Sequence, residues 1–352
     1  MSATALHLHL PGLLGPLPDQ AAGLIEAGEA GRDLALLLSR GKLVREVSGL
    51  DADFRRLSLF GLEVPLGADI PVGPLSALGD GFDPGETWIY RADPVHLHPD
   101  RDSLLVLEPG RLALPVDLVA ELVRDFNRLF IDDGLMLIAP HPDRWYLQVT
   151  TTPRLRTTPL AQAIGRAMGE SLPTGEHART WVALLNEVQM LLHESALNRH
   201  RQSEGYRSVN SIWPWGGGRL PPPPDRARWS LVCSDNALVR GLARHTGIPC
   251  APLTDLVDLL DQAESEADGP VLIDMGRFPA VADSDTFQEW ESALNAFALE
   301  GAVPLYQALR NGRLQRLVLD LGERRWELKA ASLRYFWRRN RPLAYWLERS
   351  RS

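Results

Sequence analysis

The sequence predicts a layered α/β protein with a largely parallel sheet, together with a separate α+β unit. Two observations support this fold class. Between residues 228 and 300, short apolar strand patterns alternate with amphipathic helix patterns, an order typical of parallel sheets. Residues 86–175 instead combine hairpin patterns with one amphipathic helix. The length of 352 residues allows one large domain or two ordinary ones.

The N-terminal region begins with a strand pattern. Residues 5–10 alternate strictly between apolar and other side chains, and the pattern ends at Pro11-Gly12. A helical stretch is expected around residues 20–40. The run at 61–85 is rich in Gly and Pro and is expected to form loops and turns.

The middle of the chain predicts the α+β unit. Strands are expected at residues 88–90 and 103–107, and a helix with one apolar face at 116–130. Residues 134–139 and 145–149 flank a Pro-His-Pro-Asp turn and predict a hairpin. The longest helix is expected at residues 177–204.

The C-terminal third supplies the remaining strands and helices. Ser234, Asp235 and Asn236 offer N-cap side chains for a helix at 237–245. Thr254 is expected to cap a short helix. The other expected elements are strands at 230–233 and 271–275, a helix around 287–297, and a hairpin of 317–321 with 326–329.

Composition and charge exclude several classes of protein. The chain has 37 Lys and Arg against 45 Asp and Glu, a net charge of −8, which argues against a surface dedicated to nucleic acid. Its apolar runs are far shorter than the ~18 residues of a membrane helix, and the N-terminus has no basic leader. Cys233 and Cys250 are too few for a disulfide framework or a Cys-rich zinc site. We therefore expect a cytoplasmic protein.

Common cofactor and catalytic motifs are absent. The sequence contains no GxGxxG, GxxxxGK[ST], GxSxG or HExxH pattern. Gly216, Gly217 and Gly218 stand between a tryptophan and a proline-rich run, so they are expected to form a rigid turn rather than a phosphate-binding loop.

Two histidine pairs could supply metal ligands. His7 and His9 lie on one face of the first strand, and His96 and His98 have the same spacing, with Asp100 following. Polar strand or loop histidines are the favoured interpretation of both pairs.

Two arginine-rich segments could bind anions. Residues 192–224 include Asn198, Asn210 and four arginines that could hold a carboxylate or phosphate: Arg199, Arg201, Arg207 and Arg219. A helix end and connector is the favoured alternative. Residues 333–352 carry six arginines among aromatic side chains, which suits single-stranded nucleic acid or a membrane surface, but aromatic packing with arginines directed outward is favoured.

The segment at 192–224 also resembles a known family. The matching residues are His193, Asn198, Arg201, Gly205, Asn210, Ile212, Trp213, Trp215, Gly216 and Gly218. They resemble the segment that re-enters the main domain in archaeal-type, cofactor-independent phosphoglycerate mutases of the alkaline phosphatase superfamily. Weaker similarity extends over nearly the full length, and bacterial RpfE-type regulatory proteins are the nearest expected relatives.

The resemblance implies a domain organisation. It implies an alkaline phosphatase-like layered α/β main domain made of residues 1–85 and 191–352. A smaller α+β domain, residues 86–190, would be inserted into it.

The family's chemistry departs from this sequence. Those enzymes use a Ser or Thr nucleophile beside two divalent metals. The resemblance places Leu50 at the nucleophile position, and no histidine follows His245. Asp51, Asp274 and Asp320 remain as lone carboxylates, so we expect no metal, no cofactor and no catalytic residues.

The sequence thus predicts a catalytically degenerate regulatory protein that binds an unknown regulatory protein or a small anionic ligand in the crevice between its domains. The candidate ligand-binding residues are His7, His9, Asp51, Asn198, Arg201, Asn210 and Arg219. One alternative is a metal-dependent phosphomutase or phosphohydrolase whose rearranged site combines His7, His9, His96, His98, Asp51 and Arg201. The other is a nucleic-acid or membrane adaptor acting through the C-terminal segment.

Overall fold

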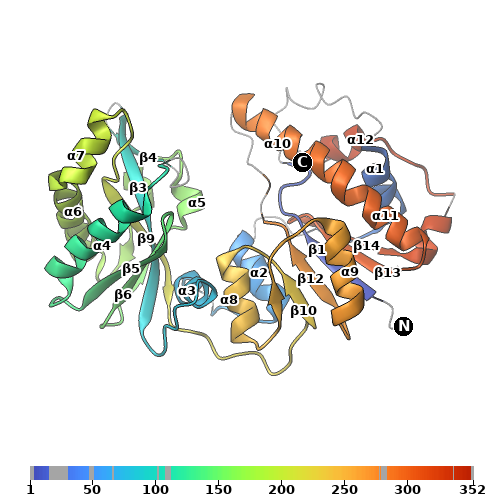
Figure 1. Cartoon of the computed structure of the whole chain (residues 1–352), viewed down its shortest axis with the longest axis horizontal. Coiled ribbons are helices and arrows are strands. Elements are labelled where there is room, and N and C mark those ends of the chain that lie inside the picture. Colours follow the sequence, from blue (N-terminus) through green and yellow to red (C-terminus); the bar gives the residue numbers. More distant parts are fainter. Residues whose placement is uncertain are drawn as a thin grey trace. The chain divides into compact units, whose positions relative to one another are not determined.

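A computed structural model describes residues 4–15, 31–46, 51–65, 67–100, 103–107, 112–276, 278, 284–335 and 337–349. The chain forms two compact units with a mixed α/β architecture (Figure 1). The first unit combines Met1–Gly61 with Pro224–Ser352, and the second is Leu62–Pro223. The first unit is therefore discontinuous in sequence.

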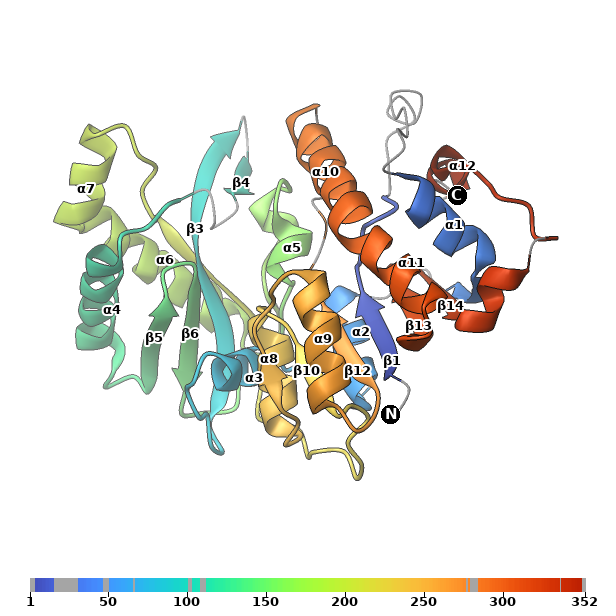
Figure 2. The same ribbon diagram turned by 45° about the vertical axis from the view of Figure 1, so that its right-hand side comes forward.

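The first unit is built on a seven-stranded sheet. Its strand order is β11-β10-β12-β1-β13-β14-β2, in which neighbours from β11 to β13 run parallel and the last two pairs are antiparallel. Figure 2 shows β1, β12 and β10 side by side. The strands are β1 (Thr4–His9), β2 (Lys42–Glu46), β10 (Leu231–Cys233), β11 (Cys250–Ala251), β12 (Val271–Asp274), β13 (Leu314–Asp320) and β14 (Arg324–Lys329). The largely parallel sheet and the C-terminal hairpin are confirmed.

The two faces of this sheet differ in chemistry because successive strand side chains point to opposite sides. Leu6 and Leu8 of β1 belong to the apolar core, whereas His7 and His9 point to the other face. Five helices and a π-helical turn contribute to the apolar core: α1 (Gly31–Arg40), α9 (Leu256–Glu266), α10 (Ser284–Ala296), η3 (Phe297–Ala302), α11 (Val303–Arg310) and α12 (Leu343–Glu348). Helices α2 (Ala52–Phe60) and α8 (Ala237–His245) contact each other, and α2 lies on the histidine side.

The second unit has its own sheet and core. Its sheet has the order β4-β3-β6-β5, with β9 paired to β3. These strands are β3 (Trp88–Asp100), β4 (Ser103–Leu107), β5 (Leu135–His141), β6 (Arg144–Val149) and β9 (Ser211–Gly218). Helices α4 (Val116–Phe130) and α6 (Ala178–Glu194) share its core cluster, and α7 (Ala196–Ser203) follows α6. The shorter elements are α3 (Val72–Gly79), α5 (Leu160–Ala163), η2 (Met168–Ser171), and the strand pair β7 (Leu155–Arg156) and β8 (Thr174–Gly175).

The second unit is wider than the predicted insertion of residues 86–190. It includes β9, which pairs antiparallel with β3, and α3, which contacts both of these strands. Pairing across one sheet therefore places residues 62–85 and 191–223 with the inserted segment.

Four local predictions were wrong, and three of them concern helices. The run at 61–85 contains α3, whose prolines lie at its N-cap and within its first turn, where a missing N–H costs little. The helix expected at 177–204 is broken at Ser195, whose extended backbone ends α6 and whose hydroxyl caps α7. The cap of α9 is Asp255, whose carboxylate accepts from the Asp258 N–H at 2.9 Å, and not Thr254.

The three glycines at 216–218 continue β9 instead of forming a turn. A Cβ atom on Gly217 would lie 2.1 Å from the Tyr90 ring, so glycine is needed there for close packing.

The C-terminal segment packs against the first unit, as the favoured interpretation of its aromatic residues predicts. Leu343, Leu347 and Trp346 join the core of that unit. Trp337 is an exception, because 68% of its surface is exposed. Among the described residues, no helix is both long and apolar enough to cross a bilayer.

Candidate functional site

In the first unit, the carboxyl ends of three parallel strands bring several polar side chains close together. His9 at the end of β1 lies in register with Asp274 of β12 on one side and with Asp320 of β13 on the other. Open parallel sheets present their functional groups at this edge, beyond the strand ends. The strand alternation that buries the leucines of β1 also directs His7 toward Asp320.

Asp320 is held by several donors. His7 Nε2 lies 3.4 Å from Asp320 Oδ2, and the Gly322 N–H donates to Asp320 Oδ1 at 3.1 Å. His9 Nδ1 lies 3.6 Å from the same Oδ1. Burial alone would raise the pKa of Asp320, but the two imidazoles outweigh burial and hold its pKa well below the ordinary value. Asp320 is therefore a half-buried, ionised carboxylate with a contact to each of its oxygens.

The two histidines differ in their contacts. Burial lowers the pKa of His7 by more than Asp320 raises it, and the charges of His9 and Arg325 lower it further. His9 is fully buried, and neither of its ring nitrogens has a hydrogen-bond partner in the described part of the chain. The pair thus lines the polar face of β1 without forming a hydrogen-bonded relay.

Asp274 is paired with an internal cation. Arg56 of α2 donates its Nε–H to Asp274 Oδ2 at 3.3 Å, and the Ser234 hydroxyl donates to the same oxygen at 3.3 Å. Arg56 also donates to Asp53 at 3.0 Å. Burial alone would lower the pKa of Arg56, but Asp274 and Asp53 outweigh burial and raise it. The guanidinium is thus a permanent positive charge at the sheet edge.

These side chains do not fit a pair of divalent metals. Such a centre needs several carboxylates and imidazoles free to converge on the ions. Here Asp274 Oδ2 accepts from Arg56 and Ser234, whereas its Oδ1 is buried and has no hydrogen-bond partner among the described residues. Asp320 is contacted by His7 and by the Gly322 N–H. Within the described ranges, no three His, Cys, Asp or Glu side chains are placed to hold a metal ion.

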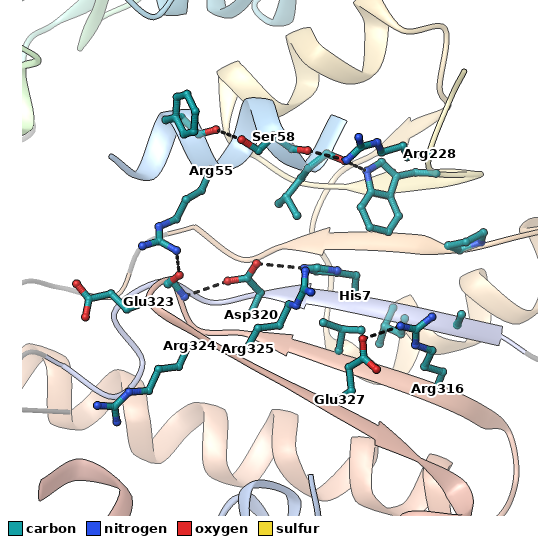
Figure 3. Close-up of a pocket in the computed structure, with 18 residues that line it drawn as sticks. His7, Arg55, Ser58, Arg228, Arg316, Asp320, Glu323, Arg324, Arg325 and Glu327 are labelled. Atoms are coloured by element: carbon teal, nitrogen blue, oxygen red, sulfur yellow. Dashed lines mark hydrogen bonds and ion pairs between the residues drawn. The ribbon is translucent and has the colours of Figure 1, made fainter. Parts of the chain in front are cut away.

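A pocket of about 500 Å³ adjoins Asp320 on the histidine side of the sheet (Figure 3). Helix α2 forms one wall with Phe54, Arg55, Ser58 and Leu59. The strand face forms the other wall with residues of β1, β13 and β14, and Trp229 also lines the pocket. All of these residues belong to the first unit.

The predicted candidates in the first unit have mixed outcomes. His7 lines the pocket, and His9 lies beside Asp320. The Asp51 side chain caps α2 by accepting from the Asp53 N–H at 2.8 Å. Leu50, the predicted nucleophile position, lies outside the described residues.

The candidates in the second unit mostly bond to backbone. The Asn198 amide donates to the Leu192 and Val209 carbonyls, and the Asn210 amide bonds both backbone groups of Leu97. Arg201 donates to the Leu112 and Arg207 carbonyls, and Arg219 donates to the Thr152 hydroxyl at 3.4 Å. The His96 ring lies 2.9 Å from the Ser208 carbonyl, and His98 is exposed on the same strand. These contacts match the favoured alternative of a connector held by backbone hydrogen bonds.

The sequence patterns did not identify four residues of this site: Arg56, Ser234, Trp229 and Arg325. Ser234 was noted only as cap chemistry, although a polar residue directly after a buried strand is a usable signal for this edge. Arg56, Trp229 and Arg325 carry no local pattern, since helix register and strand pairing alone bring them to this face.

Comparison with known proteins gives a consistent set of relatives. No family model matches the chain. A probable 2,3-bisphosphoglycerate-independent phosphoglycerate mutase from Geobacter sulfurreducens is 28% identical over 204 residues, covering 56% of this chain and 51% of that protein. The enzyme of that name from Pyrobaculum islandicum is 26% identical over 250 residues, covering 65% of this chain and 60% of that protein. The matched part thus spans about half of each relative's length.

Solved structures agree in fold. The cofactor-independent phosphoglycerate mutase from Thermoplasma acidophilum superposes with a TM-score of 0.50 at 13% identity, covering 100% of this chain and 95% of that one. The PH0037 protein from Pyrococcus horikoshii superposes with a TM-score of 0.59 at 16% identity, covering 94% and 88%. The homologues are therefore cofactor-independent phosphoglycerate mutases of the alkaline phosphatase-like superfamily, and the fold is theirs.

Proposed function

From this relationship to the cofactor-independent phosphoglycerate mutases, we propose that the chain is a catalytically degenerate relative that acts by binding a ligand or a regulatory partner. Phosphoryl transfer with two metals needs carboxylates free to hold the ions and an activated oxygen nucleophile. In this proposal the carboxylates at the sheet edge hold the fold together instead. A regulatory role of the RpfE type is part of the same proposal.

The observation that carries the proposal is the contact between Arg56 and Asp274. A guanidinium 3.3 Å from the carboxylate supplies a fixed positive charge where an ion would need an open ligand. Arg56 cannot lose its proton at any physiological pH, so its charge opposes a metal ion at this carboxylate. The Ser234 hydroxyl, also 3.3 Å from that oxygen, strengthens the arrangement.

The binding role is supported by the pocket beside Asp320. It lies within the first unit and does not depend on the residues of the second. Its volume of about 500 Å³ is within the range of ~300–1,000 Å³ usual for small-molecule sites.

The test is a joint measurement of activity and metal content. The purified chain should neither interconvert phosphoglycerates nor hydrolyse aryl phosphates, with or without manganese, while the Geobacter relative assayed in parallel serves as the positive control. Metal analysis after purification should find far less than one equivalent of divalent ion. Manganese-dependent turnover that is lost in Asp274→Asn and kept in the exposed variant Asp261→Asn would contradict the proposal.

A further inference from the structure

The pocket beside Asp320 contains a cation without a partner. Four of its five lining arginines are held by the protein: Arg55 by the Gly322 carbonyl, Arg228 by the Ser58 carbonyl, Arg316 by Glu327, and Arg324 by the Arg349 carbonyl. The fifth, Arg325, has no side-chain hydrogen bond or ion pair within the described part of the chain, and its Nε is buried. A buried donor left unbonded is costly, so its retention calls for a function.

Within the described part of the chain, none of the neighbouring carboxylates forms an ion pair with Arg325. Figure 3 shows Arg325 reaching from β14 toward His7 and Asp320. Asp320 pairs with Arg325 in strand register, but its oxygens contact His7 and the Gly322 N–H, and it forms no ion pair with Arg325. Glu327 bonds Arg316 at 2.7 Å, and Glu323 is exposed at the rim. The positive charge of Arg325 is therefore directed to the pocket.

The rest of the pocket is suited to an apolar group. The Trp229 indole is fixed by its N–H, which donates to the Leu59 carbonyl at 3.0 Å, and by an edge contact with His7 at 5.3 Å between ring centroids. Leu59, Phe54 and Val318 add further apolar surface. A fixed aromatic wall beside an open guanidinium favours a ligand with an anionic head and an apolar body.

We propose that this pocket binds a small organic oxyanion, a carboxylate or a phosphate monoester, whose charged head pairs with Arg325 and whose apolar body lies against Trp229. This deepens the proposed binding role by naming the site and the ligand chemistry. Arg325 can bond such a head in a bidentate manner, as guanidinium groups do with carboxylate and phosphate.

Calorimetric titration of the full chain tests the charge requirement. Benzoate and phenyl phosphate are the two anionic probes, and benzyl alcohol is the neutral probe of similar size. At least one anion should bind at least about tenfold more tightly than the alcohol, as expected for a charged hydrogen-bonded pair. Preference for benzoate would identify a carboxylate ligand, and preference for phenyl phosphate a phosphate ester. Equal binding of all three would overturn the proposal without any substitution being needed.

Two variants test the named residues. Arg325→Met should weaken the preferred anion by at least about tenfold without lowering Tm, because methionine replaces an unpaired buried donor. Arg310→Met, on the exposed end of α11, is the matched control and should bind as wild type does. Trp229→Leu should weaken the preferred anion but not inorganic phosphate, which has no apolar body. Unchanged binding in Arg325→Met would overturn the proposal, and inorganic phosphate binding as tightly as phenyl phosphate would overturn the role of the aromatic wall.

These outcomes are separate from the test of catalytic degeneracy. Metal-dependent turnover would contradict the proposed function while leaving anion binding at Arg325 intact. A chain that is inactive and binds no anion would keep the degenerate assignment and remove this inference.

Discussion

At the scale of single residues, the pair of Arg56 and Asp274 is the contact that most distinguishes this sheet edge. Both side chains are almost fully buried, and Arg56 is the charged partner of Asp274 while it also pairs with Asp53. Removing one partner leaves a buried charge uncompensated, which costs about 3–5 kcal/mol. We expect Arg56→Met to lose stability of this order, and Asp274→Ala to lose less, because Asp53 still pairs with Arg56 in that variant. The double variant should lose less free energy of unfolding than the two single variants together. Urea unfolding of all four proteins, analysed as a double-mutant cycle, measures this difference. Strict additivity would mean that the pair is not coupled.

His7 makes stability depend on pH. Its pKa is lowered in the folded protein, chiefly by burial, so the unfolded chain binds more protons below pH ~6.5. Stability should therefore fall as the pH drops from 7 to 5. Asp320 has a lowered pKa too, but its contribution to stability is present above pH ~4 and is lost only below that pH.

His7→Gln should show a smaller loss of Tm between pH 7 and 5 than wild type. The exposed variant His200→Gln should show the wild-type slope, and an unchanged slope in His7→Gln would assign the effect elsewhere.

The same residues show what a sequence can and cannot supply. The alternation in β1 was sufficient to place His7 and His9 on one face, opposite the leucines of the core. The partners of these residues could not be predicted, because Asp320 and Asp274 reach them through parallel pairing across hundreds of positions. Arg56 lies in a helix with no distinctive motif, and only the packing of α2 on the sheet gives it a carboxylate partner.

At the scale of elements, β9 is an extended strand whose two tryptophans are buried. Trp213 and Trp215 are 3% and 8% exposed. The Trp213 N–H donates to the Thr158 carbonyl at 2.9 Å, and the Trp215 N–H donates to Asp93 at 2.8 Å. Pro214 favours an extended backbone at the residue before it, which agrees with the strand. Its pairing with β3 was not predictable, since strand partners are chosen by tertiary packing.

Trp213 should therefore be a structural residue. Trp213→Ala removes a buried ring and is expected to cost about 3–5 kcal/mol, measured by chemical unfolding. Trp337→Ala is the control, because that ring is 68% exposed and should change stability by less than about 0.5 kcal/mol. A Tm for Trp213→Ala within a degree of wild type would contradict this assignment.

Gly217 tests how closely β9 packs. The Cβ of Gly217→Ala would fall 2.1 Å from the Tyr90 ring, so the strand or the ring has to move. We expect a loss of about 1–3 kcal/mol, the range for an overpacked core. Gly169→Ala is the matched control, since nothing lies within 4 Å of its added methyl group. Similar thermal stability in the two variants would show that β9 has room to adjust.

At the scale of the whole molecule, each unit has its own sheet and its own apolar core. The predicted organisation, a main domain in two stretches around an insertion, rested on the family resemblance. The boundaries were displaced because a strand's membership of a sheet is decided by its partner, and no local pattern in residues 191–223 reveals that β9 pairs with β3. The organisation itself leads to a direct experiment on the insertion.

Excision of residues 62–223 should leave a first unit that folds. The chain leaves and re-enters this unit at neighbouring points. Arg228 donates to the Ser58 carbonyl at 2.9 Å, and the Trp229 N–H donates to the Leu59 carbonyl at 3.0 Å. A short Gly-Ser linker can therefore join the two stretches at little entropic cost, because closure entropy grows only with the logarithm of loop length. We expect one cooperative unfolding transition by circular dichroism. The pocket should still distinguish the preferred organic anion from benzyl alcohol, since all its lining residues are retained.

Excision of residues 62–130 is the control. It removes β3 from the centre of the second sheet and should give a chain prone to aggregation, because that sheet is left partly unpaired. Absence of a cooperative transition in the 62–223 excision, with the control no worse, would mean that the first unit requires the second to fold.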